Sequence, residues 1–295
     1  MFSRRHPFLF FILIFSSILA IVIIGTSLLF TLGAPNANFD FGEKVGIIEI
    51  KGVISDSKDI IAHLKQFRED DSIKSIVLRI DSPGGGVGPS QEIFREVRKT
   101  IVQKKVITSM GTIAASGGYY VAAGTDGIVA NPGTITGSIG VIMGFTNFEE
   151  LIKKIGLVPI VIKSGKYKDT GSPVRQMTED EEKILQNFVQ TIHMQFVKAI
   201  AEGRKMDAGK VKSIADGRIF SGEEAKDLGL VDRLGNLDDA IEWAGRLGGI
   251  KGKISTVYPP EKKYSVLRYI IDLSLNTLLN RIIHRDFYGG YLFRP

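Results

Sequence analysis

The stretch KVITSMGTIAASGGYYVAAG, residues 105–124, combines the local signals that decide the fold of this chain. Residues 105–109 are mostly β-branched and apolar, which predicts a buried strand. A loop of small residues follows, and residues 116–123 then read as a short helix that begins at Ser116. Such a strand–loop–helix unit is typical of α/β folds, which place their functional sites at the ends of strands.

Ser116 lies among alanines and glycines, so a substrate can approach its hydroxyl group. Gly117 and Gly118 let the backbone turn tightly and direct N–H groups at a bound oxygen. A helix that starts here adds the positive end of its dipole. Ser116 is therefore a candidate nucleophile, and the ordinary alternative is a serine that only caps the helix.

A serine nucleophile needs a base, and histidine is a poor candidate in this chain. None of the four histidines lies in a Gly-rich loop, and the G-x-S-x-G motif is absent: His6, His63, His193 and His284. A Ser–Lys pair is the known alternative. The stretch IKSGKYKDTGSP, residues 162–173, follows a predicted strand and offers three candidates, Lys163, Lys166 and Lys168.

The rest of the chain alternates between the two-residue apolar period of a strand and the 3.6-residue period of a helix. Apolar patterning predicts strands at 45–50, 74–80, 127–130, 139–145 and 158–163, and helices at 57–68, 89–103, 147–155 and 178–203. The long last helix opens with a capping box, Thr178 and Glu181. This alternation of strands and helices indicates an α/β fold.

Five motifs occur in order along the chain. They are DSPGGG at 81–86, MGTIAASGGYY at 110–120, TGSIGVIM at 136–143, KSGKYKD at 163–169 and DGRIFSGEEAKDLGLVD at 216–232. Together they resemble the signal peptide peptidase A family, the S49 serine peptidases, in its short, single-unit bacterial form. The resemblance runs from about residue 44 to about residue 245.

The resemblance implies a role for each matching residue. Ser116 is the nucleophile and Lys168 the general base, and Ser138 hydrogen-bonds that lysine. Gly117 and Gly85 form the oxyanion hole. The resemblance also implies a ClpP/crotonase-like spiral of ββα units, ring-shaped homo-oligomers, and remnant signal peptides as substrates.

The first forty residues are expected to anchor the chain in a membrane. Residues 8–32 are nearly all apolar, and no acid or base lies between His6 and Asp40. This run exceeds the ~20 residues that span a bilayer and the ~7–15 of a cleavable signal, which is the alternative. Arg4 and Arg5 precede it, so the positive-inside rule keeps that end in the cytoplasm. We expect a single-pass protein of the cytoplasmic membrane with its catalytic domain on the outer side.

These expectations give three regions: 1–38 with the anchor and linker, 39–250 as the peptidase domain, and 251–295 as a C-terminal strand, amphipathic helix and tail. Residues 264–283 are apolar around most of the helix circumference. We expect that helix to contact a neighbouring subunit or the membrane surface. The final residues, 286–295, are expected to be a flexible extension.

Composition excludes several classes of function. The chain has no cysteine, so thiolate chemistry and disulfides are impossible. Its net charge of +6 is spread among acidic residues, and we expect no nucleic-acid partner. The histidines and aspartates are scattered, and no G-K-[ST] follows the DSPGGG loop, so neither a metal nor a nucleotide cofactor is expected.

The sequence thus predicts a membrane-anchored serine endopeptidase that cleaves apolar, membrane-derived peptides. Two other classes are considered: a crotonase-like acyl-CoA enzyme and a catalytically inactive scaffold of a membrane complex. A membrane anchor together with an intact Ser116 and Lys168 argues against both.

Overall fold

A computed structural model describes residues 7–33, 42–260 and 290–292 of the chain. The chain divides into two compact units, Met1–Gly42 and Glu43–Pro295. In the first unit, helix α2 (Pro7–Gly33) contains an uncharged apolar stretch, Phe8–Thr26, that is long enough to cross a membrane. The helix predicted at 264–283 lies outside the described residues.

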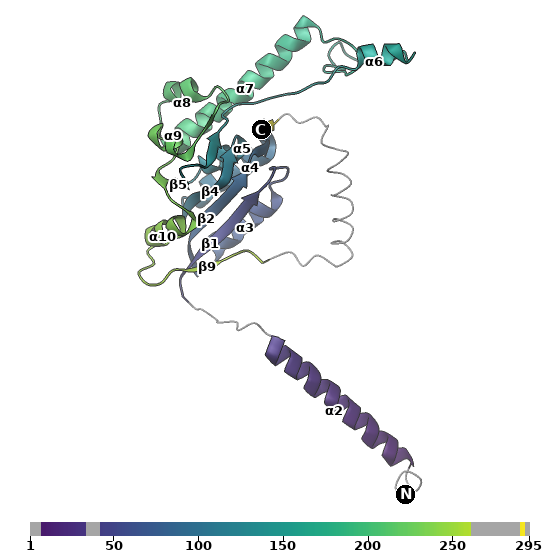
Figure 1. Ribbon diagram of the computed structural model, residues 1–295, viewed down its shortest axis with the longest axis vertical. Helices are drawn as coiled ribbons and strands as arrows, with labels where there is room; N and C mark the ends of the chain where they lie inside the picture. The colour runs from purple at the N-terminus through teal and green to yellow at the C-terminus, as the bar shows by residue number, and fades with distance from the viewer. Residues whose placement is uncertain (1–6, 34–41, 261–289, 293–295) are drawn as a thin grey trace. The chain divides into compact units, whose positions relative to one another are not determined.

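The second unit is built on a mixed sheet of eight strands (Figure 1). Its main path runs β7-β6-β4-β2-β1-β9, and β5 and β8 branch from β4. Every pairing in this sheet is parallel except that of β6 with β7. The strands are β1 (Lys44–Lys51), β2 (Ile73–Ser82), β4 (Lys105–Ala115), β5 (Gly127–Ala130), β6 (Ile135–Gly137), β7 (Ile219–Phe220), β8 (Arg233–Leu234) and β9 (Ser255–Val257).

Strand β4 pairs with β2 and with two further strands, β5 and β6, and it carries the chain to Ser116. Residues 107–109 pair with β5, whereas residues 113–115 pair with β6. The strand predicted at 105–109 therefore exists, but it continues through the small residues to Ala115. Because β4 is bonded along both of its halves, the position where it ends is fixed by the sheet.

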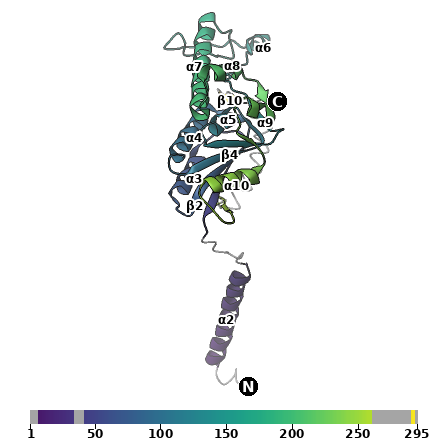
Figure 2. The ribbon, with the colours of Figure 1, turned by 90° about the vertical axis from the view of Figure 1, so that its left-hand side faces the viewer.

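Helices cover both faces of this sheet (Figure 2). One core contains side chains of α3 (Lys58–Glu69), α4 (Val87–Thr100) and α5 (Gly117–Ala122), and the other contains those of α10 (Leu237–Leu247). In β1, Ile48 and Ile50 enter the first core, whereas Val45 and Ile47 enter the second. This is the alternation that a strand buried on both faces must show.

Residues 140–195, which we call the arm, are built differently. They comprise α6 (Glu149–Lys154) and most of α7 (Glu179–Arg204), which rises from the core toward α6 (Figure 1). Among these residues, all of which the structure describes, Glu181 alone is buried. The predicted capping box is confirmed: Glu181 N–H donates to the Thr178 hydroxyl, and Thr178 N–H to the Glu181 carboxylate. Two short helices follow α7, namely α8 (Ala208–Ile214) and α9 (Gly222–Asp227).

Two of the predicted strands are wrong, and both fall mainly in the arm. Residues 139–145 and 158–163 form no regular strand. Their β-branched and apolar side chains suit a sheet, but a strand also needs a partner for its backbone groups. In residues 158–163 these side chains face outward, and Ile162 is 97% exposed.

A close backbone approach fixes α7 on α5, which makes Gly203 sensitive to substitution. A Cβ atom on Gly203 would lie 1.9 Å from the carbonyl oxygen of Ala123, directly after α5. A Gly→Ala change inside a helix normally stabilises by about 1 kcal/mol. We expect Gly203→Ala to lower the free energy of unfolding instead, by about 1–3 kcal/mol, because the backbone must shift. Urea unfolding of the full-length chain measures this.

Gly88 in α4 is the matched control, because a Cβ atom added there would have nothing in the described part of the chain within 4 Å. Gly88→Ala should be neutral or stabilising. An equal effect of the two substitutions would show that the contact between α7 and α5 is not tight.

Candidate active site

Ser116 lies at a sharp turn between strand β4 and helix α5, with φ 52° and ψ −118°. Its backbone is held from both sides, because its N–H donates to Gly137 O (2.8 Å) and its carbonyl accepts from Tyr120 N–H (2.8 Å). A residue other than glycine in this region is strained by about 1–3 kcal/mol. The geometry is that of a strand–turn–helix nucleophile elbow. Ser116 itself is buried, at 1% exposure, so the open approach to its hydroxyl expected from the small neighbours is absent in the single chain.

The G-x-S-x-G motif that usually identifies such an elbow is absent from the sequence. Ala114 and Gly118 take the positions two before and two after Ser116. A Cβ on Gly118 would lie 2.9 Å from Ser82 O, so only glycine fits there without displacement. The elbow conformation is therefore present although Ala114 replaces the first glycine of the motif. The missing motif was not evidence against an elbow at Ser116.

Strand β3 (Gly84–Gly86) lies against the start of α5. A Cβ on Gly117 would be 2.5 Å from Ser90 Oγ and 3.2 Å from Gly85 N, and one on Gly85 would be 2.2 Å from Ile54 O. Both positions thus exclude a side chain. Gly117 is also the first residue of α5, where N–H groups have no acceptor within the helix. The two glycines predicted to form an oxyanion hole are therefore close together beside Ser116.

One edge of β3 is occupied by the chain's own C-terminal region. Gly84 and Gly86 both bond to Ile54, through Ile54 N–H to Gly84 O (2.9 Å) and Gly86 N–H to Ile54 O (2.8 Å). Gly85 therefore faces the other edge, where β10 (Gly290–Leu292) runs antiparallel with Tyr291 opposite Gly85. The expectation of a wholly flexible tail is wrong for these three residues. The pairing shows that this edge accepts an extended chain.

Ser138 is brought to the same place by the neighbouring strand. Ala115 of β4 pairs with Gly137 of β6, so Ser116 and Ser138 follow adjacent strand ends. Ser138 also has a positive φ, 50°, and its N–H donates to Arg218 O (2.8 Å). The structure therefore gathers Ser116, Ser138, Gly85 and Gly117 within one chain.

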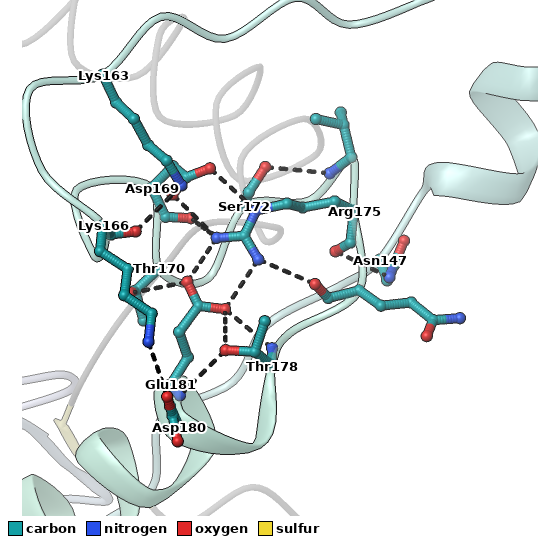
Figure 3. Close-up of polar contacts among 12 residues, drawn as sticks. Asn147, Lys163, Lys166, Asp169, Thr170, Ser172, Arg175, Thr178, Asp180 and Glu181 are labelled. Atoms are coloured by element: carbon teal, nitrogen blue, oxygen red, sulfur yellow. Dashed lines mark hydrogen bonds and ion pairs between the residues drawn. The ribbon is translucent and has the colours of Figure 1, made fainter.

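Lys168 lies elsewhere, in the loop that precedes α7. Figure 3 shows contacts that fix this loop to the first turn of α7. Lys166 pairs with Asp180 (2.8 Å), and Thr170 donates to Glu181 (3.2 Å). Lys168 itself is exposed.

Ser116, in contrast, is tied to the far end of α7. Tyr120, whose N–H bonds to Ser116 O, packs its ring on that of Phe196, with centroids 4.9 Å apart. Phe196 lies fifteen residues beyond Glu181, which corresponds to about 22 Å along a helix. A lysine side chain cannot span that length, so Ser116 and Lys168 of one chain do not meet.

The three candidate lysines differ in their partners. Lys163 donates to the Asp169 carboxylate (2.6 Å), and a hydrogen bond to Asp180 raises the pKa of Lys166 to about 12. Each of these two ammonium groups is therefore paired with a carboxylate. Among the described residues Lys168 has no hydrogen-bonding or ionic partner for its amine. This contrast favours Lys168 over its two rivals as a proton acceptor.

The sequence profile described as peptidase family S49 matches residues 98–251, just over half of the chain. The chain belongs to this family. The matched region of this S49 peptidase contains Ser116, Ser138 and Lys168, whereas Gly85 precedes it.

Three relatives illustrate the similarity. A candidate protease of Synechocystis sp. is 44% identical over 224 residues, covering 74% of this chain and 80% of the relative. A candidate signal peptide peptidase SppA of Enterococcus faecium is 38% identical over 216 residues, or 68% of this chain and 62% of the relative. A candidate protease of Methanocaldococcus jannaschii is 33% identical over 295 residues, covering 94% and 95% of the two chains.

The strain at Ser116 gives a prediction that separates function from stability. Ser116→Ala and Ser116→Gly should both lack peptidase activity because both lose the hydroxyl. The glycine variant should unfold with a free energy about 1 kcal/mol higher than the alanine variant, because glycine adopts a positive φ without strain. Peptide hydrolysis and urea unfolding measure the two effects.

Ser221 provides the control, because it also caps a helix, α9, but with an ordinary φ of −70°. There the advantage of glycine over alanine should be only that of an N-cap, and smaller than at Ser116. An equal difference at both sites would contradict the strain.

Proposed function

We propose that this S49 peptidase is a membrane-anchored serine endopeptidase whose nucleophile, Ser116, is served by Lys168 of a neighbouring copy. The observation that carries the proposal is the elbow at Ser116, which couples a strained serine to two adjacent glycine N–H groups. The second support is the position of Lys168, which is exposed at the far end of α7 from the Ser116 of its own chain.

The proposed reaction has two halves, formation and hydrolysis of an acyl-enzyme, and Ser116 and Lys168 act in both. Ser116 Oγ attacks the peptide carbonyl while Lys168 Nζ accepts the hydroxyl proton, and the N–H groups of Gly117 and Gly85 bind the oxyanion. Lys168 then donates that proton to the leaving amine as the C–N bond breaks. Water hydrolyses the acyl-enzyme by the same steps in reverse, with Lys168 as its base. Ser138 orients the amine through a hydrogen bond.

A lysine that acts as a base must be neutral, whereas a lysine in water has a pKa of about 10.4. Removal from water is the usual way to favour the neutral amine. Lys168 is exposed in the single chain, so this role requires a second surface to cover it. A neighbouring copy that presents Ser116 and Ser138 would provide that surface.

The arm supports such an assembly. It exposes many large apolar side chains, including Leu151, Ile155, Ile160, Ile162 and Phe188. Large apolar side chains exposed in such number are typical of an interaction surface. Because the arm of one copy would cover the Ser116 site of the next, the contact is head-to-tail, and such contacts close into rings. We infer a homo-oligomeric ring of ClpP/crotonase-like spiral units.

The proposed substrates are apolar peptides in extended form, such as remnant signal peptides. The edge of β3 that faces Tyr291 can hold an extended chain by backbone pairing, a common mode of peptide recognition. Helix α2 would hold the enzyme at the membrane where such peptides are released. The placement of Arg4 and Arg5 supports a catalytic domain on the outer side of the cytoplasmic membrane.

Mixing two inactive variants tests the shared site. Ser116→Ala and Lys168→Ala should each be inactive as homo-oligomers. When the two are co-expressed, random assembly should restore about a quarter of the wild-type activity, because half of the serines and half of the lysines are intact. Hydrolysis of an apolar fluorogenic peptide by the co-purified oligomer measures this.

A dyad formed within one chain would give no recovery, which would contradict the proposal. Labelling with a fluorophosphonate probe provides the control for the nucleophile: the wild-type protein should label at Ser116, and Ser116→Ala should not.

Removal of residues 290–295 tests the edge of β3. Since β10 pairs where the substrate is proposed to pair, its loss should lower KM roughly several-fold while kcat stays unchanged. Removal of residues 293–295 alone is the control and should leave KM as it is. An unchanged KM after the longer deletion would mean that substrate does not use this edge.

A further inference from the structure

The single buried side chain of the arm is a carboxylate. Glu181 is 2% exposed, although the arm has no apolar core around it. A buried carboxylate requires partners that compensate its charge and its lost hydration. Arg175 is the cationic partner that supplies this compensation.

Arg175 joins the carboxylate of Asp169 in the loop to that of Glu181 in the first turn of α7 (Figure 3). Its Nη1 donates to Glu181 Oε2 (2.8 Å) and its Nη2 to Oε1 (2.5 Å). Its Nε and Nη2 donate to the two carboxylate oxygens of Asp169, both at 2.9 Å. With Nη1 also on Gln176 O (2.9 Å), every guanidinium N–H has an acceptor. Bidentate pairs of this kind fix geometry more strictly than single ion pairs.

The network holds the backbone on both sides of Lys168. Asp169 is the next residue, and its backbone oxygen also accepts from Arg175 (3.2 Å) and from Ser172 N–H (3.0 Å). On the other side, Lys166 is paired with Asp180 in the first turn of α7. The loop is therefore anchored before and after Lys168, while the Lys168 side chain stays outside the network.

We propose that Arg175 and Glu181 are positioning residues that hold Lys168 in place for Ser116 of the neighbouring copy. This inference rests on the proposed role of Lys168 as the base. The far end of α7 is fixed on α5, so the helix and the network together form one rigid bracket between the core and the Lys168 loop. Polar contacts hold this part of the arm, in which no apolar side chain is buried.

The charges of the network compensate one another, because Asp169 and Glu181 are both paired with Arg175, and Asp169 is also paired with Lys163. Arg175 first, and Lys163 second, hold the pKa of the Asp169 carboxyl well below its usual range. Arg175 likewise lowers the pKa of Glu181. Because both pKa values are lowered, the stability that these pairs contribute is present above the ordinary carboxyl pKa and is lost only in strong acid.

The test uses Glu181→Gln and Arg175→Lys in the full-length protein. Glutamine keeps the shape of Glu181 without its charge, and lysine keeps the charge of Arg175 without its fork. We expect kcat to fall on the order of 10- to 100-fold in each, as a misplaced catalytic group would cause, with KM unchanged. The double variant should be no worse than the poorer single one, because both break the same network. Glu179→Gln, in the same turn but 92% exposed, should match wild type.

The outcomes separate this inference from the proposed function. If Lys168→Ala keeps wild-type activity, the proposed base is wrong. If Lys168→Ala is inactive while Glu181→Gln and Arg175→Lys retain wild-type kcat, the base stands and the positioning role is wrong. Sedimentation of each variant checks assembly: a variant whose oligomer is lost, but whose remaining oligomer has wild-type kcat per site, would also overturn the positioning role.

Discussion

The strained backbone of Ser116 is the constraint on which the rest of the site depends. A positive φ at a non-glycine residue persists only where the surroundings leave no alternative. Here β4 is held by β5 along one half and by β6 along the other, and Gly137 O accepts the Ser116 N–H. The backbone of Ile54 leaves no room for a Cβ atom at Gly85, and Ser90 and β3 leave little room for one at Gly117. Close packing around Ser116 thus requires small residues at these positions, independently of any role in catalysis.

The arm and the core are stabilised by different kinds of interaction. The core buries apolar side chains on both faces of a sheet, whereas the arm buries one glutamate and exposes most of its isoleucines and leucines. Its internal order comes from a bidentate arginine and a capping box, which fix angles without needing volume. Because polar contacts order the arm, its apolar side chains stay exposed and available to a partner. A packed core would have buried them.

The sequence predicted what depends on neighbours in the chain. The strand and helix around Ser116 and the cap at Thr178 are local patterns, and the structure has both. The family motifs identified the S49 resemblance that the profile confirms. The strands expected at 139–145 and 158–163 failed because apolar periodicity does not supply a pairing partner. The pairing of β10 with β3, and the length of α7 between Ser116 and Lys168, are properties of the assembled chain and have no local signal.

The distance between the two proposed catalytic groups has a functional consequence. A chain that holds its nucleophile at one end of α7 and its base at the other carries an incomplete site by itself. Hydrolysis would then depend on assembly, and a newly made monomer would be unable to cleave the proteins around it. Such a shared site requires the Lys168 amine to be placed precisely, because it must reach a serine on another copy. An error of about 1 Å in its position can lower the rate a hundredfold. A long helix braced by a bidentate arginine is a structure suited to that demand, because it can be rigid without being buried.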